Sequence, residues 1–313
     1  MDSANERDQV ADHLQVMAEE LFLKGDYAKA ESLFLRLLSD YKGSIDSWNV
    51  SHWLGMCYYY QNRIDEATVE LEKARAGMAE QNNSLAYALI LNYLGICYWC
   101  KDDYDRALEY FETGHEYDNL LTEEGRILEK YEFSLMWGRV LMWVGRWNEA
   151  IEKFERAEKC LEKMEPGRDR EHYANVVKYE KGRTYYYAGN QQMAGLFLEK
   201  VKGNKLDKDL IPDYHSVMIG HNDWAKKYSK VIRHYEQLSK LEMPEKMKGR
   251  LYNAVGRAYY NLGLYSESLE FFNKSLQYPA DAEWVTKSNE EYLKALMKIY
   301  PNRAESSGPR PPE

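Results

Sequence analysis

Three arginines stand in one recurring sequence context and could bind an anionic ligand. Arg139, Arg183 and Arg257 each follow a glycine directly, and a methionine or tyrosine stands three residues later. A guanidinium presents paired donors to a carboxylate or phosphate, and neighbouring aromatic side chains supply apolar contact area. This pattern predicts binding of an acidic or carboxylate-bearing segment of a protein or peptide. The alternative is that the arginines pair with neighbouring glutamates and that the aromatic side chains pack between helices.

Residues that catalyse reactions or ligate metals do not gather into motifs. Cys97 and Cys100 have the spacing of a redox dithiol, but no strand precedes them, and Cys57 and Cys160 are distant in sequence. No histidine pair has the H-x-x-x-H spacing, and no nucleophile-elbow or phosphate-loop motif occurs. We therefore expect structural cysteines, no metal, no cofactor and a protein that is not an enzyme.

Composition and charge narrow the class of protein further. The chain has 313 residues and a net charge of -9, from 42 Lys and Arg against 51 Asp and Glu. An acidic balance argues against nucleic acid as the main partner, because duplex binding needs a basic surface. No stretch approaches the roughly 18 apolar residues of a membrane span, and the N-terminus lacks the apolar region of a secretory signal. We expect a cytoplasmic protein with no membrane contact.

One pattern of about forty residues recurs along the chain. Two copies read LGMCYYYQNRIDEATVELEKA from Leu54 and LGICYWCKDDYDRALEYFETG from Leu94. Small, aromatic and apolar residues stand three or four apart within each copy, which predicts helical faces and not strands. A residue that tolerates the left-handed conformation predicts the end of the first helix in six copies, at Gly25, Asn62, Asp102, Gly145, Gly189 and Gly263. The position that opens the motif, small in all copies but the degenerate one at Ile219, falls at Ala18, Gly55, Gly95, Gly138, Gly182, Ile219 and Gly256.

These copies resemble the tetratricopeptide repeat, a helix-turn-helix unit, over roughly residues 11–280. Gly55, Tyr58, Asn62 and Ala67 match its pattern, although the spacing exceeds the usual period of about 34 residues. The resemblance implies an all-α fold, in which neighbouring hairpins stack into a right-handed superhelical solenoid. We expect one solenoid over residues 1–300, with about seven helical hairpins over 11–280, a C-terminal capping helix over 281–300 and a disordered tail over 301–313.

In such an array the first helix of each repeat lines the concave face, which predicts where a partner binds. Peptide-binding arrays of this family use inward asparagine and basic residues to hold an extended segment, and the chain reproduces that set only in part. The predicted concave-face residues are His52, Met56, Tyr59, Asn92, Ile96, Trp99, Arg139, Met142, Trp143, Tyr179, Arg183, Tyr186, Asn253, Arg257 and Tyr260.

The function predicted on this basis is that of a protein–protein interaction scaffold or adaptor that binds a peptide or partner segment in the concave groove. An alternative is a regulatory sensor or subunit that controls an effector enzyme or transcription factor. Repeats of this length are similar to those of the peptide-pheromone-responsive regulators of Gram-positive bacteria. Those regulators carry a separate N-terminal effector region, whereas the first repeat here begins by about Ala11, which favours the adaptor. The oligomeric state is left open.

Overall fold

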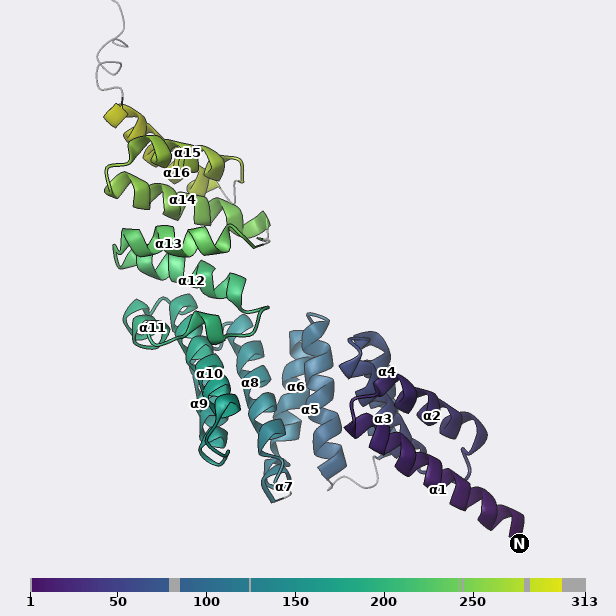
Figure 1. Cartoon of the computed structure of the whole chain (residues 1–313). Helices are drawn as coiled ribbons and strands as arrows, with labels where there is room; N and C mark the ends of the chain where they lie inside the picture. Colours follow the sequence, from purple (N-terminus) through teal and green to yellow (C-terminus); the bar gives the residue numbers. More distant parts are fainter. Residues whose placement is uncertain are drawn as a thin grey trace, which may run out of the picture. The chain divides into compact units, whose positions relative to one another are not determined.

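The computed structural model describes residues 2–78, 85–123, 125–241, 243, 245–278 and 282–299. Every regular element within these ranges is helical, namely sixteen α-helices and one short 3₁₀ helix (Figure 1). The predicted all-α class is therefore confirmed, while the predicted tail over 301–313 lies outside the described residues. Over the same ranges, helices that are both long and apolar enough for a bilayer crossing are absent.

The chain divides into two compact units, Met1–Pro166 (unit 1) and Gly167–Glu313 (unit 2). The single solenoid over residues 1–300 and its right-handed superhelical sense stay predictions.

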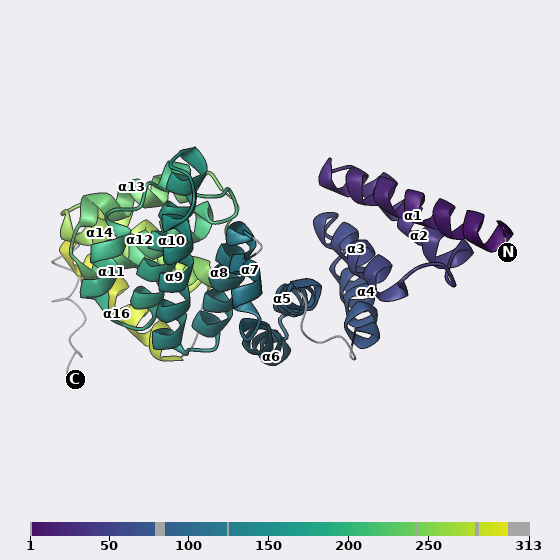
Figure 2. The same cartoon turned by 90° about the horizontal axis from the view of Figure 1, so that it is seen from below.

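Unit 1 forms four helical hairpins over its described residues. In each one the second helix begins four residues after the first ends and packs against it (Figure 2). A short additional helix, α7 (Asp118–Glu123), precedes the fourth hairpin and lengthens that repeat. The hairpins are α1 (Asp2–Leu23) with α2 (Tyr27–Asp40), α3 (Ser47–Tyr60) with α4 (Ile64–Gly77), α5 (Leu85–Cys100) with α6 (Tyr104–His115), and α8 (Ile127–Trp143) with α9 (Trp147–Glu162).

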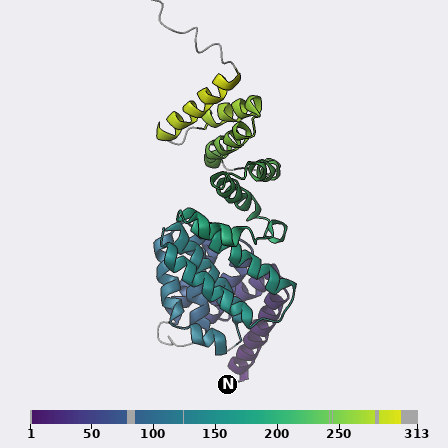
Figure 3. The ribbon, with the colours of Figure 1, turned by 90° about the vertical axis from the view of Figure 1, so that its left-hand side faces the viewer.

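Unit 2 forms three hairpins over its described residues, followed by a final helix (Figure 3). The final helix, α16 (Ala282–Ile299), packs on α15 and α14 at the place predicted for the capping helix. The short 3₁₀ helix η1 (Gly203–Lys205) lies in the connection between the first two hairpins. The hairpins are α10 (Arg168–Tyr187) with α11 (Gln191–Leu198), α12 (Ile211–Trp224) with α13 (Tyr228–Leu238), and α14 (Glu245–Asn261) with α15 (Tyr265–Leu276).

The small residue of each first helix lets its partner helix approach closely. The residue sixteen positions later, on the second helix, fills the space that a side chain would need. A Cβ added to Gly138 would lie 2.5 Å from the Phe154 ring, and one added to Gly256 would lie 2.6 Å from the Phe272 ring. Both distances are shorter than carbon–carbon contact allows, so the packing of these hairpins requires glycine.

A residue in the left-handed conformation joins the two helices of every hairpin. All six predicted turn residues have positive φ, from 57° at Asp102 to 81° at Gly145. The seventh is Lys226, with φ 57°, which the sequence analysis did not identify because lysine is not a usual residue for this conformation.

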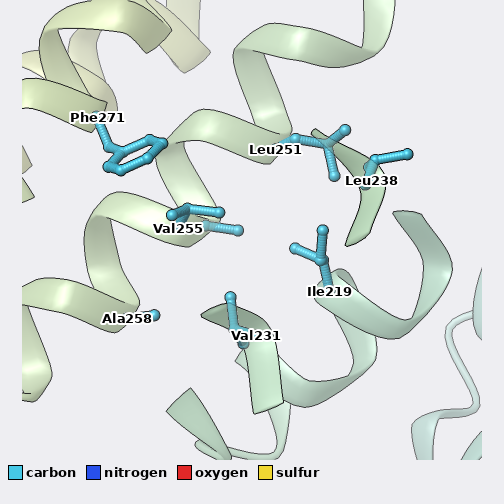
Figure 4. Packing of buried hydrophobic residues seen from close by; sticks show 8 residues of the cluster. Ile219, Val231, Leu238, Leu251, Val255, Ala258 and Phe271 are labelled. Atoms are coloured by element: carbon cyan, nitrogen blue, oxygen red, sulfur yellow. The ribbon is translucent and has the colours of Figure 1, made fainter. Parts of the chain in front are cut away.

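The degenerate repeat folds as a complete hairpin because its apolar face is intact. Ile219 stands where the other repeats have glycine or alanine and is fully buried. It belongs to a core cluster with Val231 and Leu238 of α13 and with Val255 of α14 (Figure 4). A larger residue at the small position is thus tolerated where the facing side chains leave room for it.

Candidate partner-binding surface

Many of the predicted concave-face residues are buried between helices. The Asn253 amide nitrogen donates to Glu291 Oε2 of α16 at 2.7 Å, and the Tyr179 hydroxyl donates to Asp213 Oδ2 of α12 at 2.6 Å. Such side chains stabilise the packing of first helices and do not reach a partner. The prediction that they line an open surface is therefore wrong for His52, Met56, Asn92, Ile96, Met142, Tyr179, Arg183 and Asn253, all of which are buried.

Arg183 lies inside an ion-pair network of unit 2. Its guanidinium contacts Glu180 Oε2 at 2.6 Å within α10 and Asp213 Oδ2 at 2.7 Å on α12. The Glu180 side chain is fully buried, and the Arg183 side chain is nearly so. Although burial opposes the charged form, the neighbouring carboxylates outweigh it and raise the Arg183 pKa above its ordinary value. This arginine therefore joins two repeats, and its predicted role as a cation for a partner is wrong.

Arg257 has an equivalent internal role one repeat later. Its guanidinium contacts Asp223 Oδ2 of α12 at 2.5 Å and Glu291 Oε2 of α16 at 3.4 Å. It also donates to the Asn253 side-chain oxygen within α14. Arg257 and Tyr260 line a small pocket of about 180 Å³, so part of this guanidinium remains reachable from solvent.

Arg139 differs from the other two arginines in its surroundings. It lies on α8 of unit 1, is half-buried, and directs one guanidinium nitrogen toward the Met136 sulfur at 3.5 Å within the same helix. Of the three predicted cations, Arg139 is the one that still fits the predicted partner-facing role.

The most exposed apolar side chains of the first helices lie one position beyond those predicted. The last residue of each first helix, two positions before the turn residue, is exposed in all seven described hairpins. Four of these residues are aromatic: Tyr60 and Trp143 in unit 1, with 44% and 57% of their surface exposed, and Tyr187 and Trp224 in unit 2, with 45% and 55%. The sequence carried this signal, since a large side chain recurs five positions after the small residue. The sequence analysis included Trp143 but missed Tyr60, Tyr187 and Trp224.

In unit 1 these terminal residues continue into half-buried aromatic side chains. Tyr59 and Tyr60 are edge to face, with ring centroids 5.2 Å apart, and Tyr59 packs against Tyr93 of α5 at 5.3 Å. On the next helices Trp99 and Trp143 lie 6.4 Å apart. Tyr59, Tyr60, Trp99 and Trp143 are called the aromatic surface of unit 1 below. Because these residues stand at the ends of successive first helices, their spacing follows the repeat.

A half-buried carboxyl lies beside this surface. Burial, together with the charge of Glu129, raises the pKa of Glu132 to about 7. The Glu132 charge in turn helps to raise the pKa of Tyr59 and of Tyr60, although burial is the larger cause for both tyrosines. A carboxyl that is partly protonated near neutral pH can either donate or accept a hydrogen bond when a partner covers it.

Unit 2 has its own exposed apolar side chains. Trp224 of α12 and Leu196 of α11 line a pocket of about 490 Å³. Lys200, Glu199 and Lys227 surround it, so this surface is smaller in apolar area and more charged than that of unit 1.

The cysteines have the environment of structural residues. Cys97 is buried, and that burial raises the pKa of its thiol to about 12, so the nucleophilic thiolate is scarce at neutral pH. Cys100 is exposed, yet partial burial of its thiol also raises its pKa. Across the described residues, no group of three or more His, Cys, Asp or Glu side chains is arranged to hold a metal ion.

Comparison with known families agrees with the repeat read from the sequence. The description "tetratricopeptide repeat" matches residues 47–118, which cover α3 to α6, and separately residues 249–281, which cover α15 and most of α14. The chain is a tetratricopeptide repeat protein. This family serves protein–protein interaction and is typically not enzymatic, and no catalytic domain was matched in the chain.

Curated relatives of this tetratricopeptide repeat protein match a limited part of it. The chain is 30% identical over 115 residues to the BBSome complex member BBS4 of Bos taurus, and 28% identical over 115 residues to that of Mus musculus. Each match covers 37% of this chain and 20% of the relative, so the chain spans about a fifth of the relatives' length.

Solved structures share the fold of this tetratricopeptide repeat protein. The apo form of the quorum sensor NprR from B. thuringiensis matches with a TM-score of 0.58 and 15% identity, covering 93% of this chain and 88% of that one. A tetratricopeptide repeat protein from Parabacteroides merdae matches with a TM-score of 0.52 and 14% identity, covering 91% and 99%. At these identities the likeness shows the fold alone, and it confirms the repeat solenoid architecture predicted from the sequence.

Proposed function

We propose that the chain is a cytoplasmic adaptor that binds a segment of a partner protein on the aromatic surface of unit 1. The observation that carries the proposal is the exposure of Tyr60 and Trp143 at the ends of first helices, beside the half-exposed Tyr59 and Trp99. Large aromatic side chains in contact with water are unfavourable, and they contribute strongly to binding when a partner covers them.

The comparisons support an assembly role. The curated relatives are named as members of a complex, and their match covers 37% of this chain. A role as one subunit of a protein assembly is consistent with the exposed aromatic side chains, since adaptors keep such residues available for a partner.

The partner's charge is the part of the proposal with the narrowest support. A preference for an acidic or carboxylate-bearing segment now rests on Arg139, because Arg183 and Arg257 are engaged in ion pairs. Glu132 adds a second condition, because a partner hydrogen-bond donor or cation beside it would lower its raised pKa. We therefore propose an apolar segment with mixed charge as the ligand of unit 1.

The regulatory alternative stays a prediction. The likeness to the quorum sensor NprR covers most of the chain but is one of fold, so it does not favour sensing over scaffolding. Measuring the activity of a captured effector with and without the chain would separate the two functions.

Paired substitution of exposed side chains tests the proposed surface. We expect Tyr60→Ala with Trp143→Ala to abolish partner capture from an extract of the source cells while the helical circular dichroism stays unchanged. The matched control is Leu35→Ala with Val69→Ala, because these side chains are similarly exposed, at 45% and 53%, but lie on the second helices α2 and α4. Capture by the wild type and the control, together with loss in the aromatic variant, supports the surface.

Equal capture by all three proteins would contradict the proposal. It would show that the aromatic surface of unit 1 is not where the partner binds.

A further inference from the structure

A pocket of about 440 Å³ lies in unit 1 around α7, the short helix that lengthens the fourth repeat. Its walls come from the end of α6, from α7, from the start of α8 and from the end of α9. The volume is within the range of about 300–1,000 Å³ that is usual for small-molecule sites. None of the residues that form it belongs to the aromatic surface of unit 1.

The charge of the pocket is opposite to that of the protein. Four cationic side chains line it, Lys130 of α8 and Arg156, Lys159 and Lys163 of α9, whereas Glu116 is the one carboxylate among the described lining residues. The protein as a whole has a net charge of -9. Cations brought together in this way within an acidic protein repel one another, and an anionic ligand relieves that repulsion.

The two innermost cations are held in place by uncharged groups. The Arg156 guanidinium contacts His115 Nδ1, and the Lys130 ammonium donates to the Thr122 hydroxyl at 2.7 Å. Burial, followed by the charges of Arg156, Lys153 and Lys130, lowers the pKa of His115 to about 4. The imidazole is therefore neutral at pH 7 and accepts from Arg156 through Nδ1. These contacts orient the cations without neutralising them.

The ammonium groups feel one another's charge. Burial and the charge of Lys163 both lower the pKa of Lys130, and burial lowers the pKa of Arg156 to about 10. Both directions mean that the charged forms are less favourable here than in water. A bound dianion would reverse these shifts.

The geometry points to a phosphate monoester as the ligand, and we infer that this pocket binds one through Arg156 and the three lysines. A phosphate monoester carries about -1.5 to -2 charges at pH 7 and three acceptor oxygens, which matches a planar guanidinium and several ammonium groups. A monoanionic carboxylate would leave more of the positive charge uncompensated. The phosphate could belong to a small metabolite or to a phosphoserine side chain, because both present the same group.

Calorimetric titration of the full chain tests this inference. The probes are adenosine monophosphate and a short phosphoserine peptide, each with its unphosphorylated counterpart, in a buffer without phosphate. We expect at least one phosphorylated probe to bind roughly tenfold or more tightly than its counterpart, and the tighter of the two identifies the source of the phosphate.

Charge reversal of the outer lysines locates the binding. Lys159→Glu with Lys163→Glu should weaken binding of the phosphorylated probe by about tenfold or more, because two cations are replaced by two anions. These side chains are exposed, so the fold is retained. The control, Lys208→Glu with Lys240→Glu, makes the same charge change at exposed sites of unit 2 and should leave the affinity within about twofold.

Two results would overturn the inference. One is that neither phosphorylated probe binds more tightly than its counterpart, and the other is that both double variants bind as the wild type does. Either result leaves the aromatic surface of unit 1 untouched, since the two sites share no residue.

Discussion

The two units use the same repeat position in different ways. The residue after the small residue is Arg139 in unit 1 and Arg183 and Arg257 in unit 2. In unit 2 the degenerate repeat supplies the carboxylates that engage both arginines, Asp213 to Arg183 and Asp223 to Arg257. Asp223 stands four positions after Ile219, where the other repeats have an aromatic residue or methionine.

This difference teaches what the departure from the repeat pattern does. The degenerate repeat gives up an apolar residue at that position and gains an ion pair that joins first helices within unit 2. Unit 1 keeps aromatic residues there, Tyr59 and Trp99, and its arginine stays half-exposed. We conclude that the first helices of unit 2 are tied together by charge, whereas those of unit 1 present an apolar surface to a partner.

The largest expected effect comes from removing an arginine that is internally paired. Arg183→Met should lower the free energy of unfolding by about 3–5 kcal/mol, because Glu180 and Asp213 lose their counter-ion and Glu180 is fully buried. Arg139→Met, at the matching position of unit 1, should cost less than about 1 kcal/mol. Urea denaturation followed by circular dichroism measures both, and equal losses would contradict the contrast between the units.

A smaller effect, shared by both units, is expected at the small residues. Gly138→Ala in unit 1 and Gly256→Ala in unit 2 should each cost about 1–3 kcal/mol, because the added methyl would overlap Phe154 or Phe272. Gly43→Ala is the control, since no atom lies within 4 Å of its added methyl. A loss in one unit alone would mean that the hairpins of the two units are not packed in the same way.

The smallest effect is expected from the carboxyl beside the aromatic surface of unit 1. Between pH 4.5, its ordinary pKa, and about 7, folded Glu132 retains a proton that the unfolded chain has released, so its contribution lowers the free energy of unfolding as pH rises. Glu132→Gln should remove that dependence and stabilise the protein at pH 8 by about 1–2 kcal/mol.

The matched control for Glu132 is Glu109→Gln, at an exposed carboxyl of α6. Thermal unfolding of the three proteins across pH 4.5–8 gives the comparison. Parallel pH profiles for both variants would show that Glu132 is solvated like an ordinary surface carboxyl.

The sequence was sufficient to locate the hairpins, since glycine or alanine at a regular spacing and a left-handed residue after the first helix both have strict local requirements. It was not sufficient to say which helix covers which face. Periodicity places Tyr179 and Asn253 on one face of their helices, but their burial depends on Asp213 and Glu291, which are more than thirty residues away. Lys226 shows a second limit, because tertiary packing imposed a backbone conformation that its side chain does not favour.

The candidate surface could have been predicted more closely. Tyr60, Tyr187 and Trp224 follow from counting five positions beyond the small residue, at the last residue of each first helix. The residues at three positions before and four positions after the small residue looked equally suitable from sequence. Their burial depends on the neighbouring repeats, which the spacing within one repeat does not describe.

Site-specific photo-crosslinking tests the central claim most directly. A photoreactive phenylalanine analogue placed at Trp143 or at Tyr60 puts the reactive group on the aromatic surface of unit 1, and the same analogue at Val69 or Leu35 puts it on the second helices. The account predicts that one partner protein crosslinks from positions 143 and 60 in cell extract and not from positions 69 and 35. Crosslinking of that partner from positions 69 and 35 alone, or equally from all four positions, would contradict the account.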